Sequence, residues 1–177
     1  DQRAIEEGVL RGEFDCGFIV LPPREKFFVI PLVQDPIYVA LAPHHPLAQE
    51  DFFPREALAS EPYIKIRNPG YSEYDAVFDR HEVVPHTRFV MDNDFAVMGM
   101  VNKGLGYSLF PKLILRKAPF QLARIELEIP THRELGIAMR SWDRASMAAK
   151  AFVETVRTWV AAWDERVEFD ERWDNLG

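Results

Sequence analysis

With 177 residues, of which 47% are hydrophobic and 28% charged, the chain has the size and composition of one globular domain or two small lobes. Its net charge of −7 argues against a nucleic-acid-binding surface, because phosphate contacts need clustered lysine and arginine. The sequence has no apolar run long enough for a membrane span, no basic and apolar start typical of a signal peptide, and a single cysteine that excludes an internal disulfide. We therefore expect a cytoplasmic protein with no membrane partner.

Apolar runs alternate with helical periodicities from the first residues to the last helix. Strands are expected at 15–21, 27–33, 36–43, 62–67, 86–92, 107–111, 120–127 and 134–140. Helices are expected at 3–11, 51–60, 72–83, 93–104 and 146–163. This alternation predicts an α/β fold with mainly parallel sheets. The last helix carries an apolar stripe that predicts core packing, formed by Phe152, Val156, Trp159, Val160 and Trp163.

The segment "MVNKGLGYSLFP" contains a Gly-x-Gly that invites a nucleotide-binding interpretation. A dinucleotide site needs its glycines between a strand and the start of a helix, where the helix dipole favours phosphate. Here a predicted helix precedes Gly104 and Gly106, and a strand follows them. The order favours a helix C-terminus at Gly104 and a sharp turn at Gly106, rather than a phosphate site.

Four segments resemble the C-terminal effector-binding domain of LysR-type transcriptional regulators, in the family's order. They are "LRGEFDCGFI", "IPLVQDPIYVALAPHHPLA", "MVNKGLGYSLFP" and the pair "RELGIAMR" and "SMAAKAFVETV", together spread over residues 5–160. The resemblance implies two Rossmann-like lobes of the type 2 periplasmic-binding-protein kind, joined by two crossover strands. It also implies that a small, possibly anionic effector binds between the lobes.

Mapped onto the chain, the resemblance gives residues 1–41 to the first part of lobe I and 42–134 to lobe II. Residues 135–166 become a crossover strand and the C-terminal helix of lobe I, and 167–177 an acidic tail. The family's helix-turn-helix and the first strand, helix and strand of lobe I have no counterpart here. Lobe I is thus expected to be incomplete. DNA contact is expected only through a helix-turn-helix domain absent from this chain, and the full-length form is expected to be a homo-oligomer.

Ligands of open α/β sheets bind beyond the carboxyl ends of the strands, and the family resemblance points to the same strand ends. The effector-binding residues expected on this basis are Val20, Leu21, Arg67, Asn68, Met91, Asp92, Asn93 and Phe110. Arg67 is either a bidentate clamp for a carboxylate or an exposed arginine at a strand end. The helix that starts at Asn93 could hold an anion on its N–H groups, but Asp92 and Asp94 oppose this and favour plain capping.

No catalytic or metal-binding constellation emerges from the spacing of reactive residues. His44 and His45 face opposite ways and have no third ligand at a suitable distance, so a turn is favoured over a metal site. Cys16 lies in an apolar strand, where we expect a buried, inert thiol. We therefore expect a binding protein, not an enzyme, that needs no cofactor. A stand-alone solute-binding protein of the same fold is the alternative, and a small α/β enzyme a weaker one.

Overall fold

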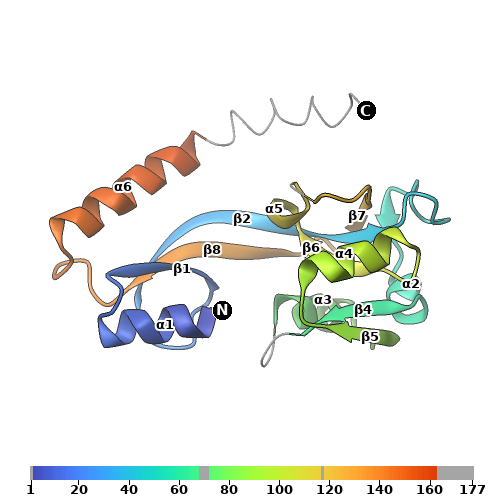
Figure 1. Ribbon diagram of the computed structural model, residues 1–177, viewed down its shortest axis with the longest axis horizontal. Helices are drawn as coiled ribbons and strands as arrows, with labels where there is room; N and C mark the ends of the chain where they lie inside the picture. The colour runs from blue at the N-terminus through green and yellow to red at the C-terminus, as the bar shows by residue number, and fades with distance from the viewer. Residues whose placement is uncertain (1, 68–71, 117, 163–177) are drawn as a thin grey trace. The chain divides into compact units, whose positions relative to one another are not determined.

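The computed structural model describes residues 2–67, 72–116 and 118–162. The contacts divide the chain into two units: unit 1 comprises residues 1–34 and 134–177, and unit 2 comprises residues 35–133. Strands β2 (Phe28–Leu41) and β8 (His132–Met139) each begin in one unit and end in the other (Figure 1). Among the described residues, no helix has the length and apolar character that crossing a membrane requires.

Unit 1 contains α1 (Gln2–Arg11), β1 (Cys16–Leu21) and α6 (Met147–Ala161), together with its parts of β2 and β8. β1 runs antiparallel to β8. The α1 side chain of Ile5 lies against Gly17 of β1, where any side chain would collide with it. Behind this strand pair lies a small core built on Ile137, Met139 and Val153.

The apolar stripe of α6 is only partly in the core, which corrects the sequence-based prediction. Ala149 and Val153 are buried, whereas Phe152 is 46% and Trp159 is 52% exposed. Trp163 lies outside the described residues. Periodicity predicts which helix face seeks apolar contact, but the width of the surface that covers it depends on the rest of the fold. In unit 1 that surface reaches only one side of the stripe.

Unit 2 holds the remaining elements, most of which are labelled in Figure 1. They are β3 (Phe52–Phe53), α2 (Arg55–Ser60), β4 (Tyr63–Ile66), α3 (Glu73–His81), β5 (Thr87–Met91), α4 (Asp94–Asn102), β6 (Ser108–Pro111), α5 (Lys112–Leu115) and β7 (Ala123–Leu127). β4 pairs with β5, and β3 with β7, in parallel. β6 and β7 pair with β2 antiparallel. The prediction of mainly parallel sheets is therefore wrong, because helix–strand alternation does not determine how strands distant in sequence align.

Two segments differ locally from the sequence-based prediction. Gln34 and Asp35 do not separate two strands; they lie inside the continuous strand β2. The segment 51–60 is not one helix capped by Asp51, because Phe52 and Phe53 form β3 and helix α2 begins only after Pro54. Phe52 and Phe53 pair with β7, and this tertiary pairing outweighs the local capping signal of Asp51.

The predicted turn after α4 is confirmed by the backbone. Gly104 has a φ of +74°, the left-handed conformation of a helix C-terminus. Gly106 has a φ of +154°, and a Cβ there would collide with the carbonyl oxygen of Pro62. The close approach brings the N–H of Tyr107 within 2.9 Å of that same oxygen. Tyr107 is fully buried, and its hydroxyl donates to the carbonyl of Leu58 at 2.6 Å.

Candidate functional site

The carboxyl ends of β4 and β5 bring three of the predicted site residues together. The N–H of Arg67 donates to the carbonyl of Met91 at 2.8 Å, which extends the β4–β5 ladder by one bond. The side chain of Arg67 forms an ion pair with Asp92, and both side chains are largely exposed. Arg67 thus already holds a carboxylate of its own chain, and a ligand carboxylate would have to displace it.

Asn93 is the N-cap of α4, as the capping interpretation predicted. Its side-chain oxygen accepts the N–H of Ala96 at 3.0 Å. The start of α3 is capped in a similar way: the hydroxyl of Ser72 accepts the N–H of Asp75, and the Asp75 carboxylate accepts the N–H of Ser72. At both helix N-termini, backbone N–H groups therefore already donate hydrogen bonds to side chains of this chain.

The other predicted site residues lie elsewhere. Val20 and Leu21 are in unit 1, where the side-chain amide of Gln2 both donates to the carbonyl of Val20 and accepts its N–H, each at 3.0 Å. Phe110 lies in β6 with 0% exposure, within the core of unit 2. Asn68 falls outside the described residues.

A charged cluster in unit 2 was not found by sequence reasoning. Asp35 is 1% exposed. Its Oδ2 accepts a hydrogen bond from Nε of Arg133 at 3.0 Å and forms an ion pair with one terminal nitrogen of the same guanidinium, also at 3.0 Å. Its Oδ1 accepts the N–H of Leu113 at 3.0 Å. The remaining terminal nitrogen of Arg133 reaches Glu73 at 3.3 Å. We call Asp35, Glu73 and Arg133 the Arg133 cluster.

Tyr74 and Asp94 interact electrostatically with charged groups of the Arg133 cluster. No described residue forms a hydrogen bond or ion pair with the Asp94 carboxylate or with the Tyr74 hydroxyl. Burial raises the pKa of Asp94, while the charge of Arg133 lowers it and that of Glu73 raises it; the net shift is upward. Burial, followed by the charges of Glu73 and Asp94, raises the pKa of Tyr74, so its phenol stays protonated at neutral pH. No spacing pattern could have revealed this cluster, since Asp35 and Arg133 are 98 residues apart.

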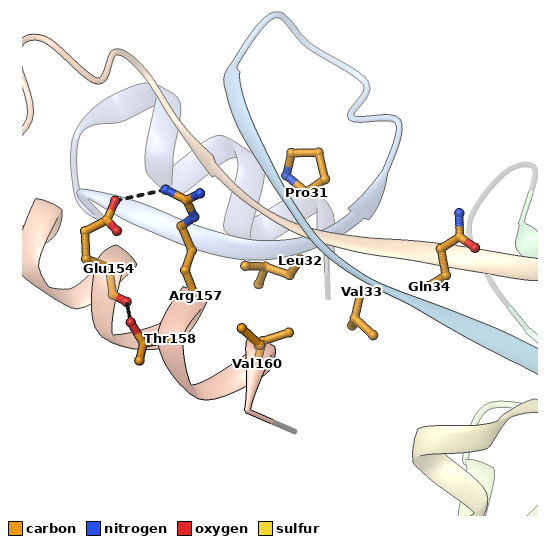
Figure 2. A pocket seen from close by; sticks show the side chains of 9 residues that line it. Pro31, Leu32, Val33, Gln34, Glu154, Arg157, Thr158 and Val160 are labelled. Carbon is orange, nitrogen blue, oxygen red and sulfur yellow. Dashed lines mark hydrogen bonds and ion pairs between the residues drawn. The ribbon is translucent and has the colours of Figure 1, made fainter. Parts of the chain in front are cut away.

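A second candidate is a groove of about 660 Å³ in unit 1, between β2 and the C-terminal half of α6 (Figure 2). Pro31, Leu32, Val33 and Gln34 line one side, and Glu154, Arg157, Thr158, Val160 and Ala161 line the other. Its charged groups are satisfied internally: Arg157 pairs with Glu154 at 3.1 Å, and the Thr158 hydroxyl donates to the Glu154 carbonyl at 2.9 Å. The two charged side chains that line the groove are therefore already paired with each other.

Cys16 is half-buried rather than buried, which corrects the sequence-based expectation. Burial, followed by the charge of Asp15, raises the pKa of its thiol. The reactive thiolate is therefore disfavoured at neutral pH.

Comparison with known proteins places this fold in a family. The LysR substrate binding domain model matches residues 1–161. The chain belongs to the LysR substrate-binding domain family. The HTH-type transcriptional regulator YvbU of Bacillus subtilis is 30% identical over 146 residues, which are 81% of this chain and 49% of the relative. The probable regulator LrrA of Synechococcus elongatus is 26% identical over 89% of this chain and 53% of its own length. The chain thus spans about half the length of these curated relatives.

Solved structures of LysR regulators share the fold. The CcmR regulatory domain of Synechocystis, in complex with 2-PG, has a TM-score of 0.79 and 23% identity over 90% of this chain and 80% of that one. The effector-binding domain of QuiR, in complex with shikimate, has a TM-score of 0.76 and 23% identity over 90% of this chain and 78% of that one. The chain therefore has the type 2 periplasmic-binding-protein-like fold of LysR effector-binding domains, as the sequence motifs predicted.

Proposed function

We propose that this chain is the effector-sensing domain of a LysR-type transcriptional regulator and that it binds a small molecule without transforming it. Family membership supports the proposal, as do the relatives named as HTH-type regulators and the similar domains solved with 2-PG and shikimate. The relatives' names also favour a regulator over a stand-alone solute-binding protein. The full-length regulator would be a cytoplasmic homo-oligomer that contacts DNA through a helix-turn-helix domain.

The proposed binding residues in unit 2 are Arg67, Met91, Asp92 and Asn93. One observation carries this choice: the Arg67–Met91 hydrogen bond joins the carboxyl ends of two parallel strands directly before helix α4. Such strand ends are where α/β folds bind ligands. Roles for Val20, Leu21, Asn68 and Phe110, the lobe boundaries and a position of the effector between two lobes stay predictions.

The proposed mechanism is a population shift. β2 and β8 belong to both units, so a ligand that binds one arrangement of the units more tightly would favour that arrangement. The free energy that couples effector binding to DNA binding would be set by the difference between the binding free energies of the ligand for the two arrangements.

Thermal-shift and calorimetric titration of the 177-residue chain tests the proposal with a panel of carboxylates, amino acids, amines and small aromatic compounds. A ligand at 100 times its Kd should stabilise the chain by about 2.7 kcal/mol. Arg67→Ala should change the affinity, whereas Arg11→Ala should not, because Arg11 is an exposed α1 residue paired with Glu13. Absence of saturable binding, together with no effector-dependent change in DNA binding by the full-length regulator, would contradict the proposal.

A further inference from the structure

The first turn of helix α3 contacts both the strand that leads to the proposed effector site and the Arg133 cluster. On the side of the site, Nζ of Lys65 in β4 lies 3.1 Å from the Asp75 carboxylate. The same carboxylate accepts the N–H of Ser72 at 2.9 Å, which closes the capping box. On the other side, the Glu73 carboxylate accepts a hydrogen bond from Arg133 at 3.3 Å. One helical turn therefore joins two polar contacts that come from different parts of unit 2.

Arg133 and Asp35 lie where the two shared strands leave unit 2. Asp35 is the first residue of unit 2 on β2, and Arg133 is its last residue on β8. Their ion pair at 3.0 Å is buried, so the separation of the two groups would be costly. We therefore expect a shift of the Arg133 guanidinium to shift Asp35 as well, and so to act on both strands.

The C-terminal end of α3 is fixed to the segment that leads into β8. The N–H of Ile129 donates to Nε2 of His81 at 3.1 Å. The Arg80 guanidinium donates to the carbonyl of Pro130, also at 3.1 Å. Because this end is anchored, a displacement of the first turn pivots the helix, and the change is taken up at the Arg133 cluster.

The proposed effector site can act on the Lys65 contact through charge. Lys65 and Arg67 are two residues apart on an extended segment, so their side chains leave the same face. The side chain of Lys65 is 39% exposed, which gives its ammonium room to move. An anionic group bound at Arg67 would attract this ammonium and compete with Asp75 for it. Occupancy of the site is thereby converted into the loss of a contact on the first turn of α3.

We propose that the first turn of α3 is a relay that carries occupancy of the effector site to strands β2 and β8. Its polar steps are Lys65, Asp75, Glu73 and Arg133. This inference rests on the proposed function and adds to it the regulation of the same site. An occupied site weakens the Lys65–Asp75 contact, the first turn shifts, and the Glu73 carboxylate changes its hold on Arg133. A chain of contacts is a physical path only when cutting it uncouples its two ends.

Heteronuclear NMR of the 177-residue chain tests the relay without an identified effector. Lys65→Met removes the ammonium from Asp75, as an occupied site would. The reporters are the N–H of Leu113 and the Nε–H of Arg133, which both donate to Asp35. We expect Lys65→Met to shift both resonances by more than their line widths.

Glu73→Gln cuts the relay, because a neutral amide holds Arg133 less strongly than a carboxylate does. Adding Lys65→Met to this variant should therefore leave both reporters where Glu73→Gln alone places them. The matched control is Lys103→Met, which removes an exposed lysine at the C-terminal end of α4 and should move neither reporter.

The outcomes separate this inference from the proposed function. Reporters that stay in place in Lys65→Met, or that move equally with and without Glu73, overturn the relay. A control that moves them as far as Lys65→Met does so too. Each of these results leaves effector sensing to the ligand titration described above. Far-UV circular dichroism verifies folding; should Glu73→Gln unfold, Glu73→Asp cuts the same contact by shortening the side chain while it keeps the charge at the helix start.

Discussion

The buried ion pair between Asp35 and Arg133 gives the sharpest test of how unit 2 is held together. Arg133→Met removes the guanidinium and keeps most of the apolar stem. Asp35, which is 1% exposed in the chain, is then left with the Leu113 N–H as its partner among the described residues. Breaking a buried ion pair from one side costs about 3–5 kcal/mol, because an uncompensated charge is left behind. The contact with Glu73, which is partly solvated, adds up to about 1 kcal/mol.

Urea denaturation followed by far-UV circular dichroism measures this loss. A change of 3 kcal/mol lowers the unfolding midpoint by at least about 1 M urea. The double variant Asp35→Asn, Arg133→Met removes both charges and should recover much of the loss. Arg157→Met is the matched control: its pair with Glu154 is exposed, so its loss should stay below about 1 kcal/mol. The reasoning is refuted when Arg133→Met is no more destabilising than Arg157→Met, or when the double variant is less stable than Arg133→Met alone.

Three further predictions concern unit 2. Gly106→Ala should destabilise by several kcal/mol in a thermal melt, because its Cβ would meet the Pro62 carbonyl oxygen at a φ that side chains rarely adopt; wild-type stability would contradict this. Tyr107→Phe should cost about 1–2 kcal/mol, because the Leu58 carbonyl loses its hydroxyl donor; an unchanged urea midpoint would argue against the bond. Burial alone would raise the pKa of Asp75, but the capping-box hydrogen bonds and the adjacent lysine outweigh it and lower the pKa below the ordinary 3.8. The stability that Asp75 adds is therefore complete above that value and is lost as the pH falls through the lower folded-state pKa. The gap in free energy of unfolding between the unmodified chain and the Asp75→Asn variant should accordingly narrow between pH 7 and pH 3. A gap that widens on acidification would be inconsistent with the lowered pKa.

The candidate site was only partly predictable from the sequence. Asn93 as an N-cap and the turn at Gly104 and Gly106 follow from residue type and local order, and the structure confirms them. The rule of strand ends led to Arg67 and Met91, which the structure brings together through one hydrogen bond. The pairing of Arg67 with Asp92 could not be read from the sequence, because the alignment of β4 with β5 decides it.

By itself, the sequence determined most of the helices and strands in their order, and the family, because periodicity, capping residues and short motifs are local properties of the chain. The tertiary structure alone decided the strand directions, the half-exposed stripe of α6 and the meeting of Asp35 with Arg133 across 98 residues. These features depend on which surfaces become neighbours after packing. A buried charge needs a partner beside it in the folded chain, and no local sequence pattern shows which distant residue that partner is.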